Sequence, residues 1–147
     1  MSSLVSAEEV EFRVTFGMFA LVTGAGGDPL ADERPIAAIV DGGVGFFSAA
    51  RDHSVSVRLE FWDAEPDDPP LDECVVAGDV VLAASAVALV GIDGGGYREF
   101  PAPFDGRARV LVSCTGREEA ARLERDEHEA FFSDVEYWLV WMWPHRA

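Results

Sequence analysis

The sequence contains no lysine, no asparagine and no glutamine, so all 11 of its basic residues are arginine. We attribute these absences to the codon usage of a GC-rich genome. Cysteine is scarce as well, since Cys74 and Cys114 are the only two. Two cysteines are too few for a disulfide framework. Both lie in apolar, strand-like runs, and we expect them to be buried free thiols.

Long hydrophobic runs are also missing. The longest apolar run, residues 80–92, is too short and too rich in alanine to span a bilayer. The opening stretch, MSSLVSAEEVEF, lacks the basic region followed by an apolar region that is typical of a signal peptide. The sequence therefore predicts a cytoplasmic protein that makes no contact with a membrane.

Positive charge is in short supply. The chain has 27 acidic and 11 basic residues and a formal net charge of −16. Such an excess costs self-repulsion in the compact state. Binding to the phosphates of nucleic acid or of an anionic membrane requires a basic surface, so these partners are excluded. The charge favours a basic protein partner, multivalent cations or simple solubility.

Motifs of catalysis and metal binding are absent too. The histidines, His53, His128 and His145, do not stand at metal-ligand spacing, and there is no Cys-x-x-Cys pair. No Gly-x-Ser-x-Gly turn occurs, and no glycine run continues into the Lys-Ser/Thr of a phosphate loop. The acidic run DAEPDDPPLDE lacks the glycine of an EF-hand loop. We predict no catalytic residues, no cofactor and no metal; an enzyme built from scattered carboxylates is the weakest hypothesis.

Alternation of apolar and polar residues is the strongest pattern that is present. It is clearest in 55–62, where Val55, Val57, Leu59 and Phe61 alternate with polar residues, and it recurs in 10–16 and 107–114. Further strands are predicted at 18–23, 36–40, 44–50, 73–77 and 97–100, the fourth closed by a turn at 78–79. The apolar run 80–92 is predicted as strand with a bend at 84–86, and a buried helix is the alternative. Many short strands between turn signals predict an all-β antiparallel sandwich, with residues 1–147 as one domain.

The most aromatic stretch is VEYWLVWMWP, at 135–144. Both of its alternating sets are mostly apolar, which predicts a strand covered on both faces and central in a sheet. Pro144 cannot continue a hydrogen-bonded ladder and is predicted to end this strand.

Carboxylates gather in two stretches, an acidic, proline-rich loop after residue 62 and a polar excursion at 116–133. A short helix is predicted in the excursion, near 117–130. Solvated loop charge is the plain interpretation of both stretches. The functional interpretation is an anionic surface that docks on a basic partner. Its candidate contact residues are Asp63, Glu65, Asp67, Asp68, Asp72, Glu118, Glu119, Glu124, Asp126, Glu127, Glu129 and Asp134.

The C-terminal part combines GRARVLVSCTGRE, an acidic spacer and EYWLVWMWP, over residues 106–144. This pattern resembles the small bacterial β proteins grouped around competence protein J, an inhibitor of a DNA-entry nuclease, and related immunity-type proteins. The resemblance implies a non-enzymatic inhibitor or immunity-type protein that neutralises a basic partner such as a nuclease or a toxin. No inhibitor residue is carried over from the family. The alternative is a structural β protein that self-associates as a homo-oligomer.

Overall fold

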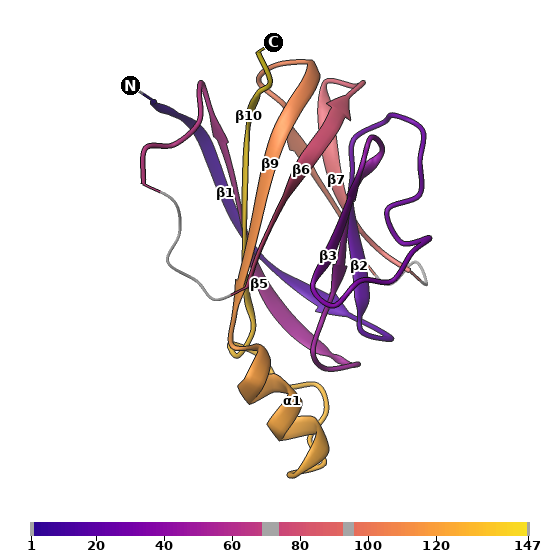
Figure 1. Cartoon of the computed structure of the whole chain (residues 1–147). Helices are drawn as coiled ribbons and strands as arrows, with labels where there is room; N and C mark the ends of the chain where they lie inside the picture. Colours follow the sequence, from indigo (N-terminus) through magenta and orange to yellow (C-terminus); the bar gives the residue numbers. More distant parts are fainter. Residues whose placement is uncertain (1, 69–73, 93–95, 147) are drawn as a thin grey trace.

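The computed structural model describes residues 2–68, 74–92 and 96–146. These residues form two stacked β-sheets with a helix projecting from one end (Figure 1), which confirms the predicted β-sandwich. The elements are β1 (Leu4–Val14), β2 (Met18–Val22), β3 (Ala37–Val40), β4 (Gly43–Phe47), β5 (His53–Trp62), β6 (Cys74–Leu82), β7 (Ala86–Gly91), β8 (Tyr97–Pro101), β9 (Gly106–Thr115), α1 (Arg117–Arg125) and β10 (Tyr137–Pro144).

Each sheet has five strands. The first, sheet A, has the order β1-β5-β10-β9-β6, and the second, sheet B, has the order β3-β4-β2-β7-β8. Neighbouring strands are antiparallel except for β5 and β10, which run parallel. The chain passes from sheet A to sheet B at the tight turn between β1 and β2.

Strand β10 is the middle strand of sheet A, as its two apolar faces predicted. Trp138, Val140 and Met142 on one face are buried in the core between the sheets. Trp141 and Trp143 on the other face are buried as well. Pro144 is the last residue of the strand, in agreement with its inability to donate to a ladder.

An aromatic cluster joins the two sheets. The ring of Trp138, from sheet A, lies 5.2 Å from the ring of Phe46 and 5.8 Å from that of Phe19, edge-on to both. Phe19 and Phe46 come from neighbouring strands of sheet B, and their rings stack at 4.5 Å. Edge-to-face contacts of this kind stabilise the core beyond the area that they bury. A strand near the C-terminus is thereby fixed to the middle of sheet B.

The turn predicted at 78–79 is wrong, because β6 runs through it. A Cβ on Gly78 would lie only 2.9 Å from the side chain of Ile39. The glycine therefore allows close approach of the two sheets, a role that a glycine inside a strand often has. The apolar run that follows divides as its predicted bend suggested, into the end of β6 in sheet A and β7 in sheet B. The alternative of a buried helix there is wrong.

The cysteines occupy facing positions on β6 and β9, where Cys74 and Cys114 are register partners. Cys114 is buried, as expected. The side chain of Cys74 lies outside the described residues. Among the helices of the described chain, none is long and apolar enough to cross a membrane.

Candidate functional site

The two acidic stretches leave sheet A at opposite ends. One follows the C-terminal end of β5 and the other the C-terminal end of β9. Because β5 runs parallel to β10 and β9 runs antiparallel to it, these two ends are opposite. Figure 1 shows α1 extending away from the end that holds both chain termini. The fold therefore does not bring the predicted contact residues together on one surface.

The first stretch begins with Asp63, whose carboxylate accepts a 2.7 Å hydrogen bond from the N–H of Ser3. Glu65, Asp67 and Asp68 are exposed. Asp72 lies outside the described residues. Pro66 is buried, so this loop is held against the protein while its carboxylates face solvent.

The second stretch forms a defined end of the sandwich. We call residues 13–17, 48–54 and 116–137 the α1 end. Its helix begins after Gly116, which has a φ of +82°. A Cβ on this glycine would lie 1.8 Å from the carbonyl oxygen of Val135, so only glycine fits where the excursion starts and ends. Ala120 is fully buried and packs the helix against the sheets.

Backbone hydrogen bonds tie the excursion to the loop after β4 and to the start of β5. The N–H of Phe131 donates to the carbonyl of Asp52 at 2.7 Å, and the N–H of Ser54 donates to the carbonyl of Phe132 at 2.9 Å. The N–H of Arg51 donates to a carboxylate oxygen of Glu124 at 2.6 Å. The excursion is thus an ordered part of the fold.

Arg117, the first residue of α1, anchors the helix to sheet B. Its guanidinium donates to the carbonyl oxygens of Phe47 at 2.7 Å and Pro35 at 2.8 Å. It also lies 5.9 Å from the ring of Trp138, close enough for a cation–π contact. The helix that the acidic composition predicted is therefore held in place by one of its few basic residues.

Several predicted carboxylates of the α1 end are neutralised by arginine. Arg122 donates to Glu119 and Glu127, and Arg125 donates to Asp126. These hydrogen bonds lower the pKa of Glu119 and of Asp126 below the ordinary range of carboxyls. Among the described carboxylates of this end that were predicted to contact a partner, those without an ion pair or a side-chain hydrogen bond are Glu118, Glu129 and Asp134. These three are the predicted contact residues whose negative charge is not paired within the protein.

Strained backbone and exposed aromatic rings coincide at this end. Four non-glycine residues of the described chain have positive φ, namely Phe16, His128, Phe131 and Asp134, and all of them lie here. For a bulky residue such a φ is rare and costly. The rings of Phe16 and Phe131 are 56% and 65% exposed. Because strained backbone gathers at functional sites, this end is the candidate binding surface.

The two exposed rings flank the same turn. The N–H of Gly17, the residue after Phe16, donates to the carbonyl of Arg51 at 2.8 Å. The N–H of Phe131 donates to the carbonyl of Asp52, the residue after Arg51. The guanidinium of Arg13 stacks over the ring of Phe131 at 4.5 Å from its centroid. This contact orients the ring without covering it. The α1 end therefore carries two exposed aromatic side chains as well as the unpaired carboxylates of Glu118, Glu129 and Asp134.

The same end contains a polar cluster of Ser48, which is half-buried, with His53 and Glu136. The Ser48 hydroxyl and Nε2 of His53 are hydrogen-bonded at 2.6 Å, and the His53 ring packs on Phe132 at 4.8 Å. His53 and Glu136 are both fully buried. Burial lowers the pKa of His53 below its ordinary value, so that the neutral imidazole is favoured.

The cluster lacks the geometry of a catalytic triad. In a triad the carboxylate accepts a hydrogen bond from Nδ1 of the histidine. Here the oxygens of Glu136 accept from the N–H of Ala49 at 3.0 Å and from the indole N–H of Trp138 at 2.7 Å. Nδ1 of His53 is buried and has no hydrogen-bond partner in the described chain. No group of metal-ligating side chains occurs among the described residues either.

Phe16 and Phe131 are absent from the residues predicted to contact a partner. The two rings are exposed because of the conformation of the turn and of the excursion. From sequence alone, an aromatic residue in an alternating pattern is ordinarily assigned to the core. Each residue nevertheless has a feature in the sequence that suggests exposure. Phe16 stands directly before Gly17 in a turn, and Phe131 lies in an otherwise acidic segment that has few apolar residues to bury it.

Two solved structures have a similar fold. Over 99% of both chains, this protein is similar to ComJ from Bacillus subtilis, described as an inhibitor of the DNA-degrading activity of NucA, with a TM-score of 0.62 and 13% identity. It is also similar to the product described as crocagin biosynthetic gene J, over 96% of this chain and 98% of that one, with a TM-score of 0.64 and 16% identity. No protein-family model and no curated protein sequence matches the chain. The chain has a ComJ-like fold.

Proposed function

We propose that this protein is a non-enzymatic inhibitor that binds a basic protein, such as a nuclease or a toxin, through its α1 end. The observation that carries this proposal is the pair of exposed rings on strained backbone, Phe16 and Phe131, at an end of the sandwich that also carries unpaired carboxylates. Aromatic residues supply much of the affinity of protein interfaces, and rim charges set the rate of association. ComJ, which shares the fold, is described as a nuclease inhibitor, and this description supports the inhibitory role.

Charge supports the choice of partner. With a net charge of −16, the protein attracts basic surfaces at a distance. A nuclease must bind phosphates and therefore has a basic cleft. Carboxylates at the α1 end would occupy that cleft and exclude the nucleic acid. The proposal takes residues 1–147 as one domain that acts in the cytoplasm and needs no cofactor.

The test begins with capture of partners from the native host and continues with purified components. A captured nuclease or toxin is assayed for activity with increasing amounts of this protein, at low and at high salt. We expect stoichiometric inhibition and an association rate that falls as salt rises, because screening weakens steering. Inhibition with an association rate that does not change with salt would contradict the proposal that charge steers the two proteins together.

A pair of matched variants locates the surface. Glu118→Arg lies on α1, and Asp67→Arg lies in the loop after β5; both residues are exposed, and the two substitutions change the net charge equally. We expect Glu118→Arg to weaken binding about tenfold, and Asp67→Arg to have a much smaller effect. Equal effects would show that total charge, and not the α1 end, determines the affinity. A protein that forms a stable homo-oligomer and captures nothing would support self-association instead.

A further inference from the structure

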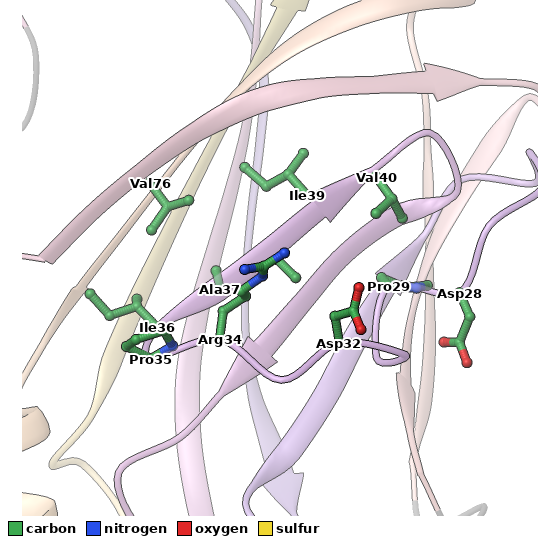
Figure 2. Close-up of a pocket in the computed structure, with 11 residues that line it drawn as sticks. Asp28, Pro29, Asp32, Arg34, Pro35, Ile36, Ala37, Ile39, Val40 and Val76 are labelled. Carbon is green, nitrogen blue, oxygen red and sulfur yellow. The ribbon is translucent and has the colours of Figure 1, made fainter.

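At one side of the sandwich the edges of the two sheets close on each other. The N–H of Val81 in β6 donates to the carbonyl of Asp41, the residue after β3, at 2.9 Å. A Cβ on Gly78 of β6 would lie 2.9 Å from the side chain of Ile39 of β3, and Figure 2 shows Ile39 directed toward the strand that carries Val76. The edge strands at the other side are β1 of sheet A and β8 of sheet B. An open sheet edge is therefore to be sought there.

Strand β1 is the longer and the less protected of these two edge strands. It has 11 residues and no proline, and its register with β5 is regular from Ser6 onward. Strand β8 has five residues and ends at Pro101, whose nitrogen cannot donate to a ladder. Short strands and proline are two means by which proteins shield a sheet edge from further pairing. Residues 7–11 of β1 have neither.

Two hydrogen bonds of β5 show which of its residues face β1. The N–H of Ser56 donates to the carbonyl of Glu136, just before β10, at 3.1 Å. The N–H of Asp63 donates to the carbonyl of Ser3, just before β1, at 3.0 Å. Because the direction of the backbone groups alternates along a strand, even-numbered residues of β5 face β10 and odd-numbered residues face β1.

The pairing of β1 with β5 then shows which backbone groups of β1 point away from the sheet. From Ser6 onward, the even-numbered residues of β1 are the register partners of odd-numbered residues of β5, as Val10 is of Val57. The hydrogen-bonding groups of these even-numbered residues are used within sheet A. In the described chain β1 pairs with β5 alone. Over residues 7–11, the N–H and C=O groups that face away from sheet A belong to Ala7, Glu9 and Glu11.

These residues are accessible. Glu9 and Glu11 are exposed, and Ala7 is half-buried. The alternate residues, Glu8 and Val10, have their side chains on the inner face of the sheet, where Val10 packs against the core. Glu8 is nevertheless exposed, and Val10 is only half-buried. Sheet B therefore does not cover this part of the edge.

The charge of this edge is negative, because Glu8, Glu9 and Glu11 all lie on it. Glu9 is 3.5 Å from Arg58, which also donates to Glu60, and its side chain remains 61% exposed. Glu8 and Glu11 form no ion pair within the described ranges. Opposite charges on neighbouring strands attract, and like charges destabilise the pairing. The edge therefore disfavours a second copy of this chain and favours a basic strand.

We propose that residues 7–11 of β1 bind an extended basic segment of another protein as an added strand of sheet A. The backbone of the segment pairs with the outward-facing groups of Ala7, Glu9 and Glu11. Its lysine or arginine residues lie at alternate positions on the outer face, and its apolar residues lie on the inner face beside Val10. Addition of a strand to a sheet edge is a common mode of peptide recognition, in which main-chain hydrogen bonds supply affinity and alternate side chains supply specificity.

This site does not rest on the proposed inhibitor function. It is continuous with the α1 end, because Arg13, near the end of β1, lies 4.5 Å from the centroid of the Phe131 ring. A partner bound at the α1 end thus has the edge of β1 beside it. The peptide site is tested without such a partner, so that the failure of one proposal is distinguishable from the failure of the other.

The experiment is a titration of the ¹⁵N-labelled full chain with a defined peptide, followed by NMR. The probe is a seven-residue peptide of alternating lysine and valine, and its control has glutamate in place of lysine. We expect chemical-shift changes in the amides of Ala7, Glu9 and Glu11 with the lysine peptide, and binding at least about tenfold weaker with the glutamate peptide. Shift changes confined to other strands, or none at all, would overturn the proposal.

Hydrogen exchange separates strand addition from simple attraction between charged side chains. In the free protein the amides of Ala7, Glu9 and Glu11 should exchange faster than those of Glu8 and Val10, which are bonded to β5. A saturating amount of the lysine peptide should slow the exchange of the first three amides by at least about tenfold. Peptide binding without this protection would contradict strand addition, and so would amides of Ala7, Glu9 and Glu11 that are already protected in the free protein.

Methylated peptides and two matched variants complete the test. Methylation of every second peptide nitrogen blocks the ladder when the methylated set faces β1, so one methylated set should abolish binding and the other should leave it. Glu11→Arg reverses an exposed charge on the edge, and we expect it to weaken the lysine peptide about tenfold and to strengthen the glutamate peptide. Asp32→Arg is the control of equal charge, because Asp32 is exposed in the loop before β3, at the other side of the sandwich (Figure 2). Equal effects of the two variants, or binding that is insensitive to both methylated sets, would overturn the proposal.

Discussion

The carboxylate of Glu136 accepts a 3.0 Å hydrogen bond from the backbone N–H of Ala49, although 87 positions separate the two residues. Glu136 immediately precedes β10 of sheet A, and Ala49 follows β4 of sheet B. The second oxygen of the carboxylate accepts the indole N–H of Trp138 at 2.7 Å. A fully buried acidic side chain thus fastens the loop after β4 to the base of the excursion that forms the α1 end.

Replacement of Glu136 by glutamine is expected to destabilise the protein. Two N–H donors point at the two carboxylate oxygens, and an amide can accept only with one of its terminal atoms. The amide NH₂ would then face a buried N–H group, so we expect the free energy of unfolding to fall by about 1–3 kcal/mol. Urea unfolding measures this change. Glu129→Gln, at an exposed position, is the matched control, and an equal loss in both variants would contradict the assigned role.

His53 should make stability depend on pH. Its pKa is lowered, chiefly by burial, and the charge of Arg13 acts in the same direction, whereas the nearby carboxylates of Glu136, Glu124 and Asp52 oppose the shift. Below about pH 6.5 the histidine of the unfolded chain gains a proton that the folded protein takes up only at lower pH. The contribution of His53 is therefore fully present above about pH 6.5 and is lost as the pH falls from there toward its folded-state pKa. Urea unfolding at a series of pH values measures the slope.

Variants separate this effect from the titration of the carboxylates. His53→Leu should remove a slope of up to about 1.4 kcal/mol per pH unit in the range just below pH 6.5. His128→Ala, which changes an exposed histidine of the same end, should retain that slope. A pH profile of His53→Leu that parallels the unmodified protein would show that His53 does not titrate on unfolding.

The turn at Phe16 should show a conflict between stability and binding. Phe16 and Gly17 have φ values of +55° and +73°, the pattern of the two-residue turns that favour Asn-Gly. Phe16→Asn should therefore be more stable than Phe16→Ala by about 1 kcal/mol, since asparagine adopts this conformation more readily than alanine. Thermal unfolding measures the difference. Both variants remove the ring and should weaken partner binding equally; retained binding in either would remove Phe16 from the proposed interface.

Gly116 should tolerate no side chain. Its φ is +82°, and a Cβ would lie 1.8 Å from the carbonyl oxygen of Val135. We expect Gly116→Ala to lower the free energy of unfolding by more than about 2 kcal/mol, through backbone strain and through displacement of the excursion. Gly26→Ala is the control, because nothing lies within 4 Å of its Cβ position. Similar stability of the two variants in urea would contradict the tight closure at residue 116.

Strands in which apolar and polar residues alternate were predictable from the sequence. Strand segments that depend on a contact with the other sheet were not. The pattern at 55–62 lies within β5, and the pattern at 107–114 lies within β9, because alternation directly reflects one buried and one exposed face. Gly78 was predicted to be in a turn, since its flanking sequence contains nothing about Ile39, which approaches it from the other sheet. The run at 80–92 is largely apolar because the end of β6 and the middle of β7 each bury side chains, in different sheets, whereas residues 83–85 between them are exposed.

For the candidate site, composition identified the acidic residues of 118–134 but not their arrangement. Which carboxylates remain available depends on where Arg122 and Arg125 reach, and this follows from the helix. Phe16 and Phe131 became candidates through their φ values and their exposure, which are properties of the folded chain.

The local sequence pattern determined that the chain is an acidic β-sandwich with an aromatic central strand. The spacing of apolar residues indicates which faces of a strand are buried, and the residue types give the charge. Strand order, the separation of the acidic stretches to opposite ends, and the close approach of β3 to β6 were decided by tertiary structure. These features depend on contacts between residues far apart in the sequence, such as Glu136 with Ala49 and Val81 with Asp41, and no local pattern of residues specifies which distant segments will meet.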